Sequence, residues 1–172
     1  MKFWQGMVAG FVSAIALLIV GAYGYFASGM APVATAAQPM PFEKFLASRA
    51  QRAAIGAAAK TTSPVPADEA NLLGGARLYR DNCAVCHGLP GQEESAIAKG
   101  MFPKVPQLFK GHGVTDDPVG ETFWKVQNGI RLTGMPAFKG SLSTTEMWQV
   151  SQVLAHADQL PQTVRAALSG NR

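Results

Sequence analysis

The sequence predicts an all-α chain in which a single apolar helix precedes a small helical domain. Residues Gly6–Ser28 carry no charge over 23 positions, about the length that spans a bilayer as a helix. Farther along, three stretches combine helical spacing of apolar residues with helix start and stop signals. Long Gly- and Pro-containing stretches, 88–116 and 129–142, lie between these helices, and no stretch alternates apolar and polar residues as a strand does.

The apolar segment is predicted to be an uncleaved transmembrane anchor over residues 1–28. Tyr23 and Tyr25 lie near its outer end, where the aromatic belt of a membrane helix is found. The alternative is a cleaved signal peptide, with "VATAA" at 33–37 as the small-residue cleavage site. We favour the anchor because the apolar run is longer than the core of a usual signal peptide.

Residues 29–67 are expected to link the anchor to the domain. Small residues and prolines over 29–41 indicate an extended connector. Residues 42–60 are rich in alanine, and Pro41 is placed to start a helix there. This segment is interpreted either as a helix resting on the membrane or on a partner, or as an alanine-rich spacer. The apolar residues that would share one face of the helix are Phe42, Phe45 and Leu46.

Residues 68–160 are predicted to form the compact domain, followed by a C-terminal tail over 161–172. The first helix of the domain has Asp68 as its N-cap and runs to about Asp81. Three helices joined by so much loop are too little regular structure for a self-sufficient core. Another group is therefore expected to fill the middle of the domain.

The second and third helices of the domain are delimited by capping signals. Asp117 is expected to cap the second helix, with Pro118 at its first helical position and Asn128–Gly129 as its stop. A capping box of Ser143 and Glu146 starts the third helix, which is expected to run to about Asp158.

The stretch "CAVCH", residues 83–87, holds both cysteines of the chain. A disulfide between Cys83 and Cys86 would close a tiny loop and constrain almost nothing. A structural zinc site needs four ligands at a spacing that the histidines do not give, and a thioredoxin-like pair needs a βαβ setting. The remaining interpretation is C-x-x-C-H, the attachment signature of haem c. Both thiols would bond to one covalent haem, and the His87 imidazole would reach its iron.

The other face of the iron has several candidate ligands. They are Met101, His112, Met135, Met147 and His156. Met135 is favoured because it stands in the Gly- and Pro-containing loop "NGIRLTGMPAF", and a rigidly held thioether suits stable His/Met ligation. Met101 is the runner-up. Met147 and His156 lie within the third predicted helix, where packing or surface roles are expected.

With "CAVCHG" followed by "GMPAF", residues 68–160 resemble a bacterial class I monohaem c-type cytochrome, here with a membrane anchor. The resemblance implies a small cytochrome c fold, in which three to four helices and long loops wrap around one covalent haem. It also implies that an N-terminal helix crosses a C-terminal helix near the haem edge. The residues that match the crossing are Gly75, Tyr79 and Trp148.

The resemblance implies further contacts around the haem. In this family a proline carbonyl accepts a hydrogen bond from the ligating histidine, and Pro106 in "FPKVPQLF" matches that proline, with Pro103 as the alternative. Trp124 and Arg131 are candidates to reach the haem propionates. A core aromatic and a surface charge are the plainer interpretations of these two residues.

The basic character of the chain does not indicate nucleic-acid binding. The net charge is +4 and the pI about 9.3, but residues 68–160 hold eight Lys/Arg against ten Asp/Glu. The basic excess lies in the flanking segments, which is not the footprint of a nucleic-acid surface. Basic residues close to a membrane-spanning segment are suited to anionic lipid headgroups.

The sequence therefore predicts an electron carrier rather than an enzyme, with redox proteins as partners and no small-molecule substrate. The favoured role is a haem subunit of a respiratory or photosynthetic membrane complex. Gly6, Gly10 and Ala14 support it, since their spacing lets another membrane helix approach closely. A free tethered shuttle is the alternative, supported by the flexible linker. A haem-based sensor or peroxidase is the third hypothesis and requires a displaceable Met135.

The chain is expected to be a single-pass protein of the inner (cytoplasmic) membrane, with its haem domain on the periplasmic side. Lys2 is the only charge before the apolar run, and Lys44 is the next basic residue after it, which favours an N-terminus inside. In the resembled family the haem is attached outside the cytoplasm, which agrees with this orientation.

Overall fold

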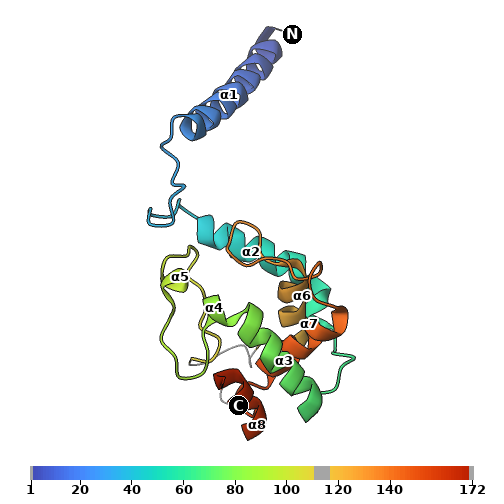
Figure 1. The fold of residues 1–172 in the computed structure, drawn as a ribbon. Coiled ribbons are helices and arrows are strands. Elements are labelled where there is room, and N and C mark those ends of the chain that lie inside the picture. The colour runs from blue at the N-terminus through green and yellow to red at the C-terminus, as the bar shows by residue number, and fades with distance from the viewer. Residues whose placement is uncertain (1, 111–116, 171–172) are drawn as a thin grey trace. The chain divides into compact units, whose positions relative to one another are not determined.

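The computed structural model describes residues 2–110 and 117–170, and within them all regular structure is helical (Figure 1). The prediction of an all-α fold is therefore confirmed. The chain divides into two compact units, Met1–Lys44 and Phe45–Arg172.

The first unit is dominated by α1, a single helix over Lys2–Ala27. Its segment Phe3–Ala27 is long and apolar enough to cross a membrane, with a mean hydropathy of 2.1, and none of the side chains in this window is buried. A helix that is apolar all round needs an apolar environment. The length and composition of α1 are therefore compatible with a membrane anchor, and equally with a signal sequence.

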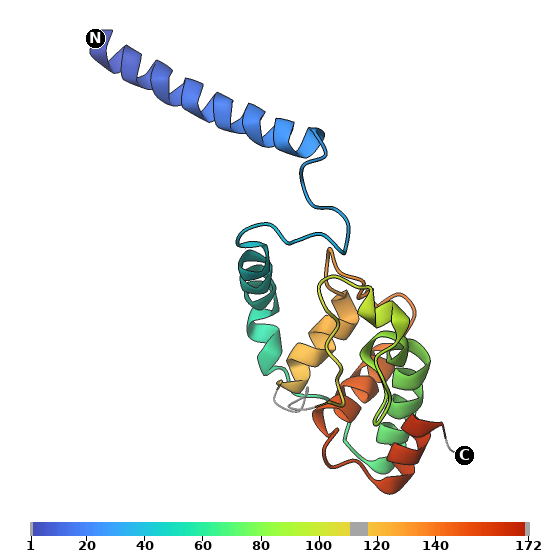
Figure 2. The ribbon, with the colours of Figure 1, turned by 90° about the vertical axis from the view of Figure 1, so that its left-hand side faces the viewer.

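The second unit contains the remaining helices (Figures 1 and 2). They are α2 (Glu43–Ile55, which starts just before the unit), η1 (Gly56–Lys60), α3 (Glu69–Asn82), α4 (Ala84–His87), α5 (Ala96–Lys99), α6 (Val119–Asn128), α7 (Thr144–Ala155) and α8 (Gln162–Ser169). The main core is formed by apolar residues of α3, α6, α7 and α8. The short helices α4 and α5 lie in the long segment between α3 and α6.

The crossing of α3 and α7 is set by Gly75. A Cβ atom at this position would lie 2.2 Å from the Gln149 carbonyl oxygen and 2.8 Å from Cγ2 of Val153. The absence of a side chain therefore lets the two helix backbones come into direct contact. Tyr79 on α3 and Trp148 on α7 are both buried, so the helix crossing that the resemblance implied is confirmed.

The capping predictions for α3 and α7 are confirmed. The Asp68 carboxylate accepts a hydrogen bond from the Asn71 N–H at 2.9 Å. Ser143 and Glu146 form a full capping box, with Ser143 accepting from the Glu146 N–H and donating its own N–H to the Glu146 carboxylate. The third helix ends at Ala155, slightly earlier than expected.

The predicted start of α6 is wrong by one residue. Pro118 is the N-cap, with φ −55° and ψ 135°, so its backbone is still outside the helix. The Asp117 carboxylate does not cap the helix and instead accepts from Lys125 Nζ at 3.1 Å. The predicted stop holds, since α6 ends at Asn128 and Gly129 turns away with φ 65°.

The structure differs from the expected linker, because much of its C-terminal half belongs to the second unit. The segment after η1 is fixed to α7 by the buried Gln152 side chain, which donates to the Val65 carbonyl at 2.7 Å. In addition, η1 packs on α6 so closely that a Cβ on Gly120 would lie 2.4 Å from the Ala58 carbonyl oxygen. Apolar residues are too sparse in this segment for its sequence to indicate that packing.

The expected C-terminal tail is also folded. Residues 162–169 form α8, and its Val164 and Leu168 side chains are fully buried in the core. Arg80 of α3 donates to the Ala167 carbonyl at 3.2 Å, which ties the end of α8 to α3. The spacing of Val164 and Leu168 is the signal that would have indicated this helix.

Candidate functional site

The two cysteines and His87 are displayed by one helical turn that directly continues α3. The Cys83 N–H donates to the Tyr79 carbonyl at 2.8 Å, and the His87 N–H donates to the Cys83 carbonyl at 2.9 Å. Cys83, Cys86 and His87 are all half-buried. Residues three and four apart on a helix lie on the same face, so the two thiols and the imidazole are presented together.

Four consecutive carbonyls, from residue 85 to residue 88, are each held by a different donor. The donors, in the order of the carbonyls, are the Ser95 hydroxyl (2.6 Å), the Gln107 side-chain amide (3.0 Å), the Leu108 N–H (3.2 Å) and the Tyr79 hydroxyl (2.8 Å). The last carbonyls of a helix have no partner within the helix. Long-range contacts supply these partners, so the turn that displays the cysteines and His87 is firmly fixed.

The orientation of His87 is set by Pro106. Nδ1 of His87 lies 2.9 Å from the Pro106 carbonyl oxygen. A carbonyl can only accept, so Nδ1 carries the proton and Nε2 keeps a free lone pair. This is the hydrogen bond that the resemblance implied, and it is confirmed for Pro106 rather than Pro103. Burial lowers the pKa of His87, against the opposing effect of this hydrogen bond, so a neutral imidazole is favoured.

Burial also affects the groups next to His87. It raises the pKa of the Cys83 thiol to about 12, and the neighbouring Cys86 adds to the effect. Burial likewise raises the pKa of Tyr79, so the Tyr79 hydroxyl stays protonated and can donate to the Gly88 carbonyl. The side of Tyr79 is covered by Phe109, with ring centroids 5.2 Å apart in an edge-to-face arrangement.

Met135 lies half-buried in a loop that is bonded back onto α6 and onto itself. The Phe138 N–H donates to the Val126 carbonyl of α6 at 3.0 Å, and the Ile130 N–H donates to the Met135 carbonyl at 3.2 Å. The Thr133 hydroxyl donates to the Ile130 carbonyl and accepts from the Met135 N–H. The Met135 thioether is therefore displayed by a well-ordered loop that packs against the core.

The structure brings Met101 to the same loop. A Cβ on Gly134 would lie 1.8 Å from Cε of Met101, so the Met101 methyl group packs directly over the residue before Met135. Met147 lies in the core with 2% exposure. His156 is the C-cap residue of α7 and so follows the helix rather than lying within it, and its Nδ1 is 2.9 Å from the Gln152 carbonyl oxygen. His112 lies outside the described residues.

The comparisons with known proteins agree with this arrangement. The family described as cytochrome C oxidase, cbb3-type, subunit III, matches residues 70–152. Residues 70–152 are a c-type cytochrome domain. Such a domain implies haem as cofactor and electron transfer as function.

One curated relative matches the cytochrome domain. The quinohemoprotein alcohol dehydrogenase ADH IIB of Pseudomonas putida is 29% identical over 93 residues, which cover 53% of this chain and 12% of the relative. The similarity thus covers only a small part of that protein. No solved structure matches the chain significantly.

The residues of the cytochrome domain fit a haem. Imidazole and thioether are both ligands that hold haem iron, and the His87 tautomer leaves Nε2 free to bind it. Besides Met135, several apolar side chains of this domain are only partly buried against the core, as expected where a flat apolar group completes the packing. They include Leu89, Leu108, Phe109 and Phe138.

The two residues suggested for the haem propionates differ in how exposed they are. Trp124 is half-buried on α6, and Arg131 is exposed in the Met135 loop. The neighbouring Phe123 stacks face to face on Trp148 of α7, with ring centroids 3.8 Å apart. Phe123 thus joins α6 to α7, a contact that sequence reasoning did not identify.

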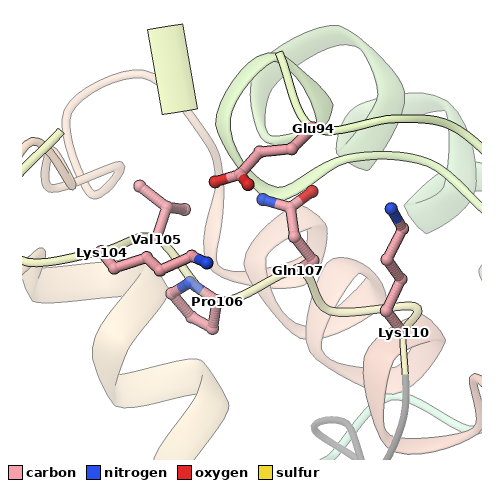
Figure 3. Close-up of a pocket in the computed structure, with 6 residues that line it drawn as sticks. All are labelled: Glu94, Lys104, Val105, Pro106, Gln107 and Lys110. Atoms are coloured by element: carbon pink, nitrogen blue, oxygen red, sulfur yellow. The ribbon is translucent and has the colours of Figure 1, made fainter. Parts of the chain in front are cut away.

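A surface cavity of about 450 Å³ lies next to the loop whose Pro106 carbonyl contacts His87. Pro106 and Gln107, which hold His87 and the Cys86 carbonyl, form part of its wall (Figure 3). Glu94, Lys104 and Lys110 also line it, and Figure 3 shows the Glu94 side chain directed toward Gln107. Charged side chains therefore lie next to the loop that holds His87.

Sequence reasoning missed Ser95 and Gln107. Ser95 also caps α5 by accepting from the Ala98 N–H, and that capping pattern was the one readable signal. Gln107 carried no signal, because a glutamine in a loop next to prolines is ordinarily a surface residue.

Proposed function

We propose that this chain transfers electrons as a membrane-anchored monohaem c-type cytochrome. One haem would be attached covalently through Cys83 and Cys86, with His87 and Met135 as the two axial ligands of its iron. The bound haem supplies an iron that cycles between the ferric and ferrous states. The observation that carries the proposal is the hydrogen bond from His87 Nδ1 to Pro106, because it prepares Nε2 as a ligand.

In this function, the protein's own contribution is to hold the two proposed iron ligands rigidly. The fixed carbonyls of residues 85–88 and the bonded loop around Met135 would hold both ligands in place in either oxidation state. Two protein ligands leave no position for a substrate, which favours a carrier over a sensor or peroxidase. A His/Met pair also raises the reduction potential.

Two matched variants test the ligand assignment. Met135→Ala should abolish the absorption band of thioether-ligated ferric haem and lower the reduction potential, while Met101→Ala should keep both. The haem should stay covalently attached in each variant, which in-gel haem staining of the denatured chain checks. The reverse pattern of spectra would make Met101 the ligand. If the unmodified protein turned over peroxide or another small molecule, the electron-carrier hypothesis would be rejected in favour of the enzyme hypothesis.

Within this function, we propose a haem subunit of a respiratory or photosynthetic membrane complex as the role. The matching family is described as a subunit of an oxidase, and the matching relative is by name a haem-containing dehydrogenase. Both similarities support the proposal that this domain works within a larger oxidoreductase. Gly6 and Gly10 of α1 have open space around them, so another helix could pack there.

Gentle detergent extraction tests this role. We expect the native chain, with residues 1–28 retained, to co-migrate with other redox subunits that mass spectrometry identifies. Recovery of the chain alone, with the same residues retained, would instead support a free tethered shuttle. Absence of residues 1–28 would show cleavage and remove the anchor from the proposal.

We also propose the inner membrane as the location, with the haem domain on the periplasmic side. Protease added to spheroplasts should release a haem-stained fragment by cutting within residues 28–42, whereas inverted vesicles should protect it. Protection in spheroplasts would contradict this orientation.

A further inference from the structure

One side of α2 carries apolar and basic side chains that the domain leaves uncovered. Phe45 and Leu46 are 61% and 62% exposed, and Arg49 and Arg52 on the following turn are exposed as well. We name these four residues the α2 outer face. At 100° per residue, Leu46 and Arg49 lie about 180° and 120° from Ile55, the one buried residue of α2, whereas Phe45 and Arg52 lie at the exposed edge, about 80° and 60° from it.

The charges of α2 favour an anionic partner. Glu43 is the only acidic residue of the helix, and its carboxylate accepts from the Met40 N–H at 2.8 Å. Within the described residues, neither Arg49 nor Arg52 forms an ion pair. Exposed apolar side chains next to unpaired arginines on one helix are typical of helices that lie in the interface of anionic membranes.

The position of α2 in the chain points to the same partner. Residues 28–42 connect α1 to α2, and a chain of this length spans at most about 50 Å. A membrane that holds α1 is therefore always within reach of the first turns of α2, where Phe45 and Leu46 lie. A protein partner would have to compete with a surface that is permanently tethered nearby.

We propose that the α2 outer face binds the surface of the membrane that holds α1, through anionic phospholipid headgroups. The proposal rests on the proposed anchor. Leu46 and Phe45 would enter the boundary between headgroups and acyl chains, and Arg49 and Arg52 would pair with lipid phosphates. Since α2 continues into η1 and η1 packs on Gly120 of α6, the bound helix would restrict the motion of the haem domain.

The test uses the full-length holoprotein in nanodiscs, with a nitroxide spin label at Ala50→Cys, one turn after Leu46. In the holoprotein both native cysteines are thioethers under the proposed function, so the label has one target. Collision rates with oxygen and with a water-soluble nickel chelate are measured in phosphatidylcholine discs with and without phosphatidylglycerol. Gln162→Cys on α8, which is also exposed, is the matched control.

With phosphatidylglycerol, the label at position 50 should gain oxygen collisions and lose nickel collisions several-fold, and high salt should reverse this. Arg49→Gln with Arg52→Gln should remove the effect, while the label at 162 stays aqueous throughout. Equal accessibility at 50 and 162 would overturn the proposal, as would an effect that ignores headgroup charge. Failure of the proposed function would instead appear as discs without inserted α1 or as haem lost on denaturation.

Discussion

Within residues 83–88, the carbonyls of residues 85–88 accept hydrogen bonds from groups nine to twenty-one positions away, whereas residues 129–142 bond mainly to themselves and to α6 just before them. We call the first segment the attachment side and the second the loop side. Gln107 and Leu108 serve the attachment side from about twenty positions away, but Phe138 of the loop side bonds to Val126 of the adjacent helix.

The difference teaches that the two proposed ligands depend on the fold to different degrees. His87 is in place only when α3, the segment around Gln107 and the core have come together. Met135 needs little more than α6 and its own loop. Damage to the attachment side should therefore reduce the stability of the whole domain, while damage to the loop side should change ligation with a smaller loss of stability.

The largest expected effect comes from Gly75→Ala on α3, which leads into the attachment side. The new Cβ would lie 2.2 Å from the Gln149 carbonyl oxygen, which is backbone and cannot move aside. We expect a loss of about 3 kcal/mol in the free energy of unfolding, measured by denaturant titration of the holoprotein. Gly74→Ala is the control. Its Cβ would meet only the Gln149 side chain at 3.2 Å, so a change within about 1 kcal/mol is expected.

The next effect tests the attachment side itself. Tyr79→Phe removes the donor to the Gly88 carbonyl and leaves this half-buried carbonyl without its protein partner, which should lower the free energy of unfolding by about 1–2 kcal/mol. Thr133→Val is the counterpart on the loop side, where the Met135 N–H loses its acceptor. We expect a smaller loss of stability there but a weaker thioether absorption band. A larger loss of stability for Thr133→Val than for Tyr79→Phe would contradict the expected difference between the two sides.

A still smaller effect on stability is expected for Gly134→Ala. The added methyl group would displace the flexible end of Met101, which lies 1.8 Å from the Cβ position, at a cost within about 1 kcal/mol. Since this is the residue before Met135, the thioether band should weaken. Gly140→Ala, with nothing within 4 Å of its Cβ, should change neither quantity. Identical spectra for both variants would show that Met101 does not constrain the Met135 loop.

The smallest effect concerns the capping box of α7, which belongs to neither the attachment side nor the loop side. The Ser143 backbone N–H lowers the pKa of Glu146 from its ordinary value of 4.5. A lowered pKa means that this stabilisation is present above the unfolded-state pKa and is lost as the pH falls through the folded-state pKa. Glu146→Gln should therefore flatten the acid side of the stability profile slightly and leave stability near neutral pH almost unchanged. A neutral-pH loss comparable to that of Tyr79→Phe would contradict this.

The loop side was the more predictable from the sequence. Its glycines and Pro136 are local signals, and the helix stop at Gly129 could be placed to the residue. The C-x-x-C-H motif likewise indicated His87 as the proposed haem ligand without any knowledge of the fold. The carbonyl donors Ser95 and Gln107 could not be predicted, because a long-range hydrogen bond leaves no pattern in the local sequence. The packing of 56–67 was missed because few large apolar residues mark that segment, whereas the spacing of Val164 and Leu168 could have indicated α8.

The order of the donors along the chain has a consequence for biogenesis. A chain exported from its N-terminus presents Cys83 and Cys86 when Tyr79 is the only one of the four donors that has already emerged. Ser95, Gln107 and Leu108 follow later, so the thiols are still accessible to a haem-attaching enzyme before the turn is locked. In the finished fold the thiols are half-buried and the pKa of Cys83 is raised to about 12, so they would react poorly. Under the proposed function, export and haem attachment would thus be coupled in time by the order in which this chain folds.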